Sequence, residues 1–232
     1  MTNTAEMKII ARIHSDFPTK FGIPRQSGLV DSLRSYIVFE PEYRDPNAIR
    51  GLEEFSHIWL IWQFSEAVRD TWSPTVRPPR LGGNTRIGVF ATRSPFRPNS
   101  IGLSSVKLEG ITADPELGAI LHVSGADLMD GTPIFDIKPY LAYTDSHEDA
   151  VGGFTSKNTW ETVTVNFPEE LLNKITEDRK DGLIGVLEQN PCPTYHTSPD
   201  RVYGMEFAGF DIGFTVSENV LKVISVKEQK TI

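Results

Sequence analysis

Cysteine is almost absent from this sequence, and so are long apolar stretches. Only one cysteine, Cys192, stands in 232 residues, so no disulfide can form within the chain and the disulfide-rich secreted scaffolds are excluded. No run approaches the roughly 18 apolar residues of a membrane-spanning helix. Residues 1–10 lack the cationic lead and apolar stretch of a secretory signal. We therefore expect a soluble cytoplasmic protein.

Basic residues are scarce as well. The chain has 23 lysines and arginines against 31 aspartates and glutamates, which gives a formal net charge of −8. A domain that holds nucleic acid through its overall charge is usually basic, so any such contact must come from a local patch. Hydrophobic residues make up 39% and aromatic residues 10% of the chain, which is enough for a core and excludes a disordered chain.

The first two thirds of the chain have the pattern of β-structure. Residues 54–64, EFSHIWLIWQF, are rich in β-branched and aromatic side chains and lack a helical stripe, which indicates a strand. Further strands are expected at 9–13, 37–39, 86–92, 103–109, 119–125 and 134–140. Many short strands separated by proline, glycine and asparagine predict a barrel or a sandwich. One short helix is predicted at 46–52.

The character of the sequence changes after about Asp149. Gly152, Gly153 and the polar run 155–159 resemble a linker. Beyond it we expect a helix that starts at Pro168, a second helix at 183–188, and strands at 162–167, 205–207, 211–216 and 221–226. The pattern thus predicts a β domain at 1–149 and a smaller α+β domain at 150–232.

Common catalytic and metal-binding motifs are missing. The histidines show neither the close pairing nor the cysteine spacing of zinc sites, and they are His14, His57, His122, His147 and His196. There is no GxSxG nucleophile elbow and no P-loop, and Cys192 has no nucleophile signature. Metal hydrolases and covalent enzymes are poorly supported, and we expect no metal.

An arginine-rich segment stands out against the acidic chain. Residues 76–102 read VRPPRLGGNTRIGVFATRSPFRPNSIG and contain Arg77, Arg80, Arg86, Arg93 and Arg97. Any one of these arginines is most simply explained as a solvated side chain of a long connection. Five together form a local cationic loop suited to phosphate or carboxylate groups, because guanidinium is a permanently charged, forked donor.

Two further segments carry candidate site residues. Residues 126–140, ADLMDGTPIFDIKPY, contain Asp127, Asp130 and Asp136. Asp130 also suits the cap of a turn, and Asp136 suits a solvent-facing strand position. Residues 20–29, KFGIPRQSGL, indicate a loop whose glycines permit close approach to a ligand.

These segments together resemble a known family. The strings KFGIPRQSGL, GLEEFSHIWLIW, RPPRLGG, GVFATRSPFRPNSIGLS and DLMDGTPIFDIKPYL occur in that order between about 9 and 145, and they closely resemble the TrmO (TsaA-like) tRNA methyltransferases. The resemblance implies a small closed β-barrel that binds S-adenosylmethionine, in place of a Rossmann-type sheet. It also implies a homodimer that methylates N6 of threonylcarbamoyl-adenosine at position 37, next to the anticodon, typically in threonine tRNA.

The resemblance assigns cofactor-binding positions residue by residue. They are Pro24, Arg25 and Gln26 of the PRQ loop, His57 and Ile58 of the aromatic strand, Arg93 of ATR, Leu103, and Asp127, Leu128, Met129 and Asp130 of the DLMD turn. The C-terminal part resembles bacterial members in outline only. Many of them have DPRPAY where this chain has NPCPTY at 190–195, so Cys192 replaces an arginine.

The implied reaction needs alignment and a proton acceptor. Methyl transfer from a sulfonium is an in-line displacement, and the attacking nitrogen must lose its proton. The candidate acceptors are Asp127, Asp130 and Asp136, of which the rigid turn favours Asp130. Arg93, Arg97 or Lys138 could pair with the threonyl carboxylate. Arg77, Arg80, Arg97 and Lys138 are the expected substrate-binding residues.

Two other functions fit the same residues. One is a non-catalytic β-barrel module with an RNA-binding or regulatory role. Such a module would bind the cofactor without transferring methyl groups. The other is a methyltransferase of the same fold that acts on a different substrate.

Overall fold

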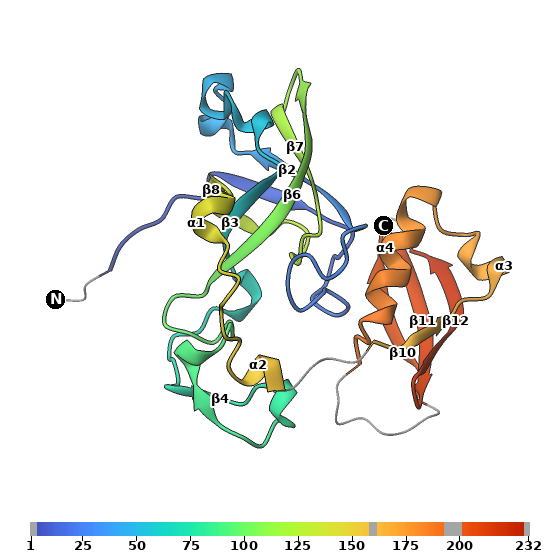
Figure 1. Cartoon of the computed structure of the whole chain (residues 1–232). Coiled ribbons are helices and arrows are strands. Elements are labelled where there is room, and N and C mark those ends of the chain that lie inside the picture. Colours follow the sequence, from blue (N-terminus) through green and yellow to red (C-terminus); the bar gives the residue numbers. More distant parts are fainter. Residues whose placement is uncertain (1–3, 158–161, 193–200, 230–232) are drawn as a thin grey trace.

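The computed structural model describes residues 4–157, 162–192 and 201–229 of the chain. These residues form two β-rich parts that lie next to each other, a larger N-terminal part and a smaller C-terminal part (Figure 1). Within the described ranges, no helix is long and apolar enough to cross a membrane.

A six-stranded antiparallel sheet forms the N-terminal part. Its order is β1-β2-β7-β6-β3-β8, and β1 pairs with both β2 and β8. The strands are β1 (Ala11–His14), β2 (Arg34–Phe39), β3 (His57–Gln63), β6 (Ile101–Asp114), β7 (Gly118–Ser124) and β8 (Pro133–Pro139). Strands were predicted in all six regions, so these predictions are confirmed. β2 and β6 extend beyond the predicted limits.

Alternation of side chains builds the core of this sheet. In β3, Ile58, Leu60 and Trp62 are buried, whereas His57 at its start is exposed. In β6, Ser104 and Val106 face the same interior, and Leu103 and Lys107 face outward. This period of two is the one expected of strands with a single buried face.

The predicted strand at 86–92 is wrong for most of its length. Only β5 (Ile87–Gly88) pairs, with β4 (Thr75–Val76), and a 3-10 turn, η6 (Val89–Ala91), follows directly. The Thr92 hydroxyl donates a hydrogen bond of 2.8 Å to the Val89 carbonyl and closes this turn. The alternating apolar residues imitate a strand, but side chain to backbone bonding competes with extension.

The predicted helix at 46–52 is two short 3-10 turns. They are η2 (Pro46–Ile49) and η3 (Leu52–Glu54). Asp45 caps the first turn by accepting a hydrogen bond from the Asn47 amide. Gly51 separates the two turns at φ 86°, a left-handed conformation that glycine adopts without steric cost. The other short elements that precede the C-terminal sheet are η1 (Pro41–Tyr43), η4 (Ser65–Ala67), η5 (Pro79–Leu81), α1 (Ala142–Asp145) and α2 (Phe154–Lys157).

The C-terminal part is a four-stranded sheet with helices on one face. Its order is β10-β11-β12-β9, with β9 parallel to β12. The elements are β9 (Thr164–Asn166), α3 (Glu169–Leu172), α4 (Glu177–Glu188), β10 (Tyr203–Phe207), β11 (Phe210–Ser217) and β12 (Val220–Glu228). The predicted element types are confirmed. α4 starts before the predicted limit of 183 because its first half is polar and carries no apolar signal.

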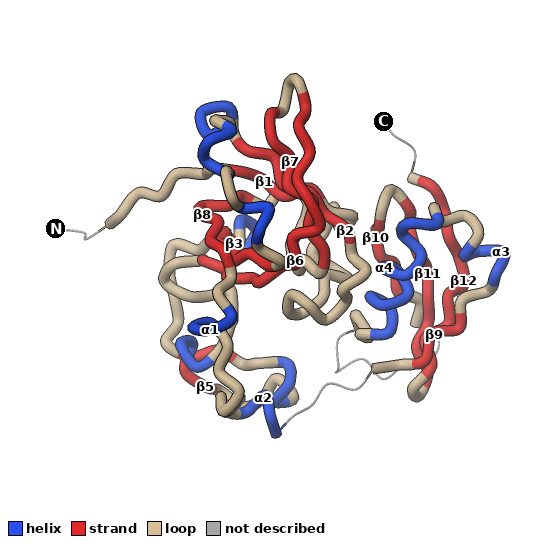
Figure 2. The backbone as a smooth tube through the Cα atoms, turned by 45° about the horizontal axis from the view of Figure 1, so that its top comes forward, coloured by secondary structure: helices blue, strands red, loops and turns tan. Residues whose placement is uncertain are grey.

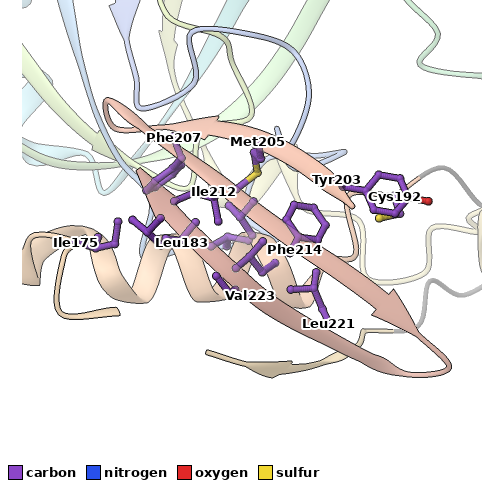
Figure 3. Packing of buried hydrophobic residues seen from close by; sticks show 14 of the residues in the cluster. Ile175, Leu183, Cys192, Tyr203, Met205, Phe207, Ile212, Phe214, Leu221 and Val223 are labelled. Atoms are coloured by element: carbon purple, nitrogen blue, oxygen red, sulfur yellow. The ribbon is translucent and has the colours of Figure 1, made fainter. Parts of the chain in front are cut away.

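The core of the C-terminal part includes side chains from the N-terminal part. Figure 3 shows Leu183 of α4 among strand residues such as Phe207 and Phe214. Phe17, Val30 and Leu33, from the segment between β1 and β2, belong to this same cluster. Figures 1 and 2 both show that segment lying beside α4.

Polar contacts and close packing fix the same junction. Arg179 of α4 lies 3.0 Å from a carboxylate oxygen of Asp16, and the Asp16 carbonyl accepts a hydrogen bond of 2.9 Å from the Ala208 amide. A Cβ at Gly185 would lie 2.6 Å from a methyl group of Val30. The segment 15–33, which contains the PRQ loop, is therefore built against the C-terminal part.

Candidate active site

Three of the sequence-predicted site segments meet at Arg93. Its guanidinium donates a hydrogen bond to the Gln26 side-chain carbonyl, which joins the ATR segment to the PRQ loop. The charge of Arg93 also acts on the carboxylate of Asp127 in the DLMD turn. Arg93 is exposed, so its remaining donors face solvent or a ligand. The structure thus brings Gln26, Arg93 and Asp127 into one cluster.

Asp127 is held by a short chain of hydrogen bonds from the core. The Ser104 hydroxyl donates to Asp127 Oδ1 at 2.6 Å, and the Trp62 indole donates to Ser104 Oγ at 3.0 Å. Burial raises the pKa of Asp127 above its ordinary value, against the opposing effects of the Ser104 hydrogen bond and the Arg93 charge. A partly buried carboxylate with a raised pKa, fixed in orientation, is suited to accept a proton.

The other two predicted acceptors have different surroundings. Asp130 accepts a hydrogen bond from the Ser15 amide at 3.1 Å and lies 3.3 Å from His14 Nδ1, and its side chain is about half exposed. Asp136 forms an ion pair of 2.8 Å with Lys138 on β8. These contacts agree with the turn-cap and solvent-face interpretations of Asp130 and Asp136.

His57 opens onto a surface pocket. The pocket has a volume of about 350 Å³. Its lining residues come from the PRQ segment and from the outer faces of β2, β3, β6 and β7, and they are Gly28, Asp31, Ser32, Arg34, His57, Ser105, Lys107, Glu109 and Ser124. His57 stands opposite Lys107 in the β3–β6 register. Gly28, two residues after Gln26, connects the pocket to the PRQ loop.

A charged network at this pocket was missed by the sequence analysis. The Glu109 carboxylate lies 2.9 Å from Arg34 and 3.1 Å from Lys107, and it accepts a hydrogen bond of 2.7 Å from Ser124. The Ser124 hydrogen bond and the neighbouring cations lower the pKa of Glu109. The alternation of β6 puts Leu103, Lys107 and Glu109 on one outer face, and this pattern was the signal that could have indicated the Lys107–Glu109 pair. Only the register of β2, β7 and β6, in which Arg34 and Lys107 both pair with Ser124, brings Arg34 to this network.

The residues at the implied cofactor positions differ in how exposed their side chains are. The side chains of Ile58 and Leu128 are fully buried in the core of the sheet. Ile58 pairs with β6 and β8, and the Leu128 carbonyl accepts a hydrogen bond of 2.8 Å from Ser15. Pro24 is buried and Met129 is partly buried. Leu103 is 51% exposed and stands opposite Ile61 of β3.

Arg25 points to the C-terminal part. Its guanidinium donates hydrogen bonds of 3.2 and 3.3 Å to the carbonyls of Gln189 and Asn190, at the end of α4. A second pocket of about 150 Å³ lies at this junction, lined by residues of 20–25 together with Val186, Gln189 and Pro191. Arg25 therefore ties the PRQ loop to α4.

The remaining arginines differ in how firmly they are held. Arg97 donates to the Thr92 carbonyl at 3.0 Å, and Arg86 donates to the Thr75 hydroxyl at 3.1 Å within the β4–β5 hairpin. Arg77 is exposed. The side chain of Arg80 lies outside what the structure describes.

Among the described residues, no group of three or more His, Cys, Asp or Glu side chains could hold a metal ion. Cys192 is buried, and burial raises the pKa of its thiol to about 11. His196, Pro193, Thr194 and Tyr195 lie outside the described residues.

Comparisons with known proteins cover nearly the whole chain. The family described as the tRNA-methyltransferase O N-terminal domain matches residues 12–146, and the TrmO C-terminal domain family matches residues 161–229. The second match shows that the C-terminal likeness is wider than the local motif at 190–195 suggested.

Similar proteins and solved structures agree with these families. A protein of Escherichia coli K12 named tRNA (adenine(37)-N6)-methyltransferase is 38% identical over 226 residues, which cover 94% of this chain and 96% of that protein. A protein of Pseudomonas aeruginosa named putative S-adenosylmethionine-dependent methyltransferase RcsF is 38% identical, with coverage of 90% and 91%. A crystal structure of TrmO from P. aeruginosa superposes with a TM-score of 0.79 at 32% identity, covering 98% of this chain and 99% of that one.

Proposed function

The chain belongs to the tRNA-methyltransferase O family, and from this premise we propose that it methylates N6 of adenine 37 in tRNA with S-adenosylmethionine as the methyl donor. The match over both domains supports the reaction. The observation that carries the site is the cluster of Gln26, Arg93 and Asp127, which come from three distant segments. The finer substrate in this proposal is threonylcarbamoyl-adenosine, typically in threonine tRNA.

The donor groups around this cluster fit S-adenosylmethionine. That molecule carries a carboxylate, an ammonium, a sulfonium and an adenine, and the pocket beside His57 offers cations, carboxylates and hydroxyls for such groups. Gln26 and His57 would provide hydrogen bonds to these groups. When bound, the cofactor supplies an electrophilic methyl group.

Asp127 is the residue that we assign to proton removal. The Asp127 carboxylate would accept the N6 proton when that nitrogen takes the methyl group that the cofactor would supply. Its position beside Arg93 and its fixed orientation support this role over Asp130 and Asp136, whose carboxylates are engaged with His14 and Lys138. The guanidinium of Arg93 donates a hydrogen bond to the neutral Gln26 amide, and its remaining donors would bind the threonyl carboxylate.

The remaining parts of the proposal concern assembly. We assign the six-stranded sheet to a closed barrel, which is supported by β1 pairing with β8 at Ala11–Ile134 and Arg12–Pro133. The domains extend over 1–149 and 150–232. The active species is a cytoplasmic homodimer, and sedimentation at micromolar concentration tests its stoichiometry.

One experiment separates the proposed function from its rivals. Mass spectrometry of tRNA nucleosides after incubation with S-adenosylmethionine should find a new methyl group on threonylcarbamoyl-adenosine. A methyl group on a different nucleoside would assign another substrate. Calorimetric binding of S-adenosylmethionine without methyl transfer to any tRNA would identify a non-catalytic module.

A further inference from the structure

The segment 68–97 leaves three large aromatic side chains exposed. Trp72 is 52%, Phe90 is 71% and Phe96 is 39% exposed. Side chains of this kind are usually buried, and exposed apolar side chains gathered in one segment indicate a binding surface. All three come from the connection between β3 and β6, so one local structure presents them.

These rings are arranged in defined pairs. Trp72 and Phe90 are stacked with centroids 6.2 Å apart and planes 29° apart. The β4–β5 hairpin brings the two rings together. The amide of Val89, which precedes Phe90, donates a hydrogen bond of 3.0 Å to the carbonyl of Pro74, two residues after Trp72. The guanidinium of Arg69 lies 3.8 Å from the centroid of the Phe96 ring.

The charge of this segment is opposite to that of the chain. Residues 68–97 contain six arginines and one acidic residue, Asp70, whereas the whole chain has a formal net charge of −8. Arg69 and Arg86 are exposed beside the aromatic side chains. Cations interleaved with exposed ring faces are the combination that binds unpaired nucleic acid, where phosphates pair with arginine and bases stack on rings.

The segment also leads directly to the reaction cluster. Arg93 lies between Phe90 and Phe96 in sequence, and it is the residue that contacts Gln26 and acts on Asp127. A base adjacent to the methylated one would therefore reach the exposed rings while its neighbour occupies the cluster.

We propose that Trp72, Phe90 and Phe96 stack the unpaired bases that flank the methylated adenosine, and that Arg69 and Arg86 pair with the phosphates of the same nucleotides. These five residues are here called the aromatic–arginine surface. This inference rests on the proposed function and names the part of the substrate that the segment recognises, which is single-stranded RNA. A second copy of this chain is a poorer occupant, because two such surfaces would place arginines against arginines.

Binding of two RNA probes tests the proposal. The first is an unmodified anticodon stem-loop, and the second is a fully paired duplex of equal length. For Trp72→Ala and Phe90→Ala, the stem-loop should bind about 5- to 150-fold more weakly per stacked base lost, while duplex affinity is unchanged. Trp72→Phe keeps a ring and should retain most of the affinity. Tyr143→Ala removes an aromatic side chain that is 87% exposed on α1 and serves as the matched control.

The possible outcomes distinguish a failure of the stacking proposal from a failure of the proposed methyl transfer. Equal stem-loop affinity for Trp72→Ala, Phe90→Ala and Tyr143→Ala would overturn the proposal, as would equal weakening for stem-loop and duplex. Dissociation of an oligomer by Trp72→Ala, seen in sedimentation, would assign the surface to self-association and also overturn it. If the unaltered protein binds the stem-loop through these rings but transfers no methyl group to full tRNA, the proposed function fails and the surface stands.

Discussion

At the scale of single residues, the local environment distinguishes aspartates that the sequence presents as equivalent. Asp127 is partly buried and accepts a hydrogen bond from Ser104, which is bonded in turn to Trp62, whereas the Asp130 carboxylate caps the backbone at Ser15 in a partly exposed turn. A carboxylate that is desolvated holds its proton to higher pH than an exposed one. The two roles therefore follow from burial and hydrogen bonding.

Replacing Asp127 by asparagine should remove the proton acceptor and keep its shape. We expect Asp127→Asn to lower the single-turnover rate about 10²- to 10⁴-fold, with nearly unchanged calorimetric affinity for S-adenosylmethionine, because the amide oxygen can still accept the Ser104 hydrogen bond. Asp130→Asn is the matched control and should keep most of the rate. Equal losses for both variants would contradict the assignment of Asp127.

The raised pKa of Asp127 gives a pH dependence with a definite sign. The rate needs the ionised carboxylate, so activity should fall as pH decreases through a pKa above that of an ordinary aspartate. The folded state holds this proton more tightly than the unfolded state, so the residue favours folding when protonated and this contribution is lost as pH rises through the folded pKa. The change in melting temperature caused by Asp127→Asn should therefore be more positive at pH 7 than at pH 4. A melting shift independent of pH would contradict this.

Arg93 and Arg77 should respond differently to a lysine that keeps the charge. Arg93 donates a hydrogen bond to Gln26, and its charge acts on Asp127. Arg93→Lys loses the forked donor set and should lower kcat/KM by roughly 10- to 150-fold. Arg77 is exposed on the hairpin, and Arg77→Lys should be tolerated because a phosphate contact depends mainly on charge. Arg77→Ala should lower the salt slope of tRNA binding by about 0.7 to 0.9. Identical behaviour of the two lysine variants would disprove this division.

At the scale of elements, α4 and the PRQ segment depend on each other. Val30 and Leu33 pack into the core that contains Leu183, and Arg25 bonds to the carbonyls at the end of the helix. The close approach of α4 to the PRQ segment is possible because Gly185, which has no side chain, faces Val30. The PRQ loop is therefore positioned by a helix that is far away in sequence.

Filling the space at Gly185 should disturb this contact. Gly185→Val places new atoms against Val30, a stiff side chain that has little freedom to move, and we expect a loss of about 1 to 3 kcal/mol in the free energy of unfolding. Affinity for S-adenosylmethionine should fall with it. Gly204→Val is the control, since a Cβ there meets no atom within 4 Å. Thermal melting and calorimetry measure both effects, and equal results for the two variants would refute the prediction.

At the scale of the whole molecule, the two parts share one apolar core at their junction. Phe17, Val30 and Leu33 are nearly fully buried, and their neighbours come from the C-terminal part. Burial of such a side chain contributes about 1.5 to 3 kcal/mol. A boundary in sequence at 149 therefore does not coincide with a boundary in packing.

Separating the two parts should weaken the cofactor site. A chain of residues 1–149 alone would expose these three side chains, so we expect a lower melting temperature and weaker binding of S-adenosylmethionine than in the full protein. Adding residues 150–232 as a separate chain by co-expression should restore both. Full cofactor affinity in 1–149 alone would mean that the PRQ loop folds without α4.

The sequence alone determined the strands outside 86–92, and it indicated the family and the segments that we propose to carry the site. Alternation in 57–63 and 101–109 depends on local side-chain period, which is readable without a fold. Local pattern failed at 86–92, where turn bonding by Thr92 outcompetes pairing. It also left three aspartates open, because only the tertiary arrangement brings Asp127 to Arg93 and decides which carboxylate is desolvated. The packing of 15–33 into the C-terminal core was decided by tertiary structure as well, since long-range complementarity between Val30 and Gly185 leaves no mark in either segment.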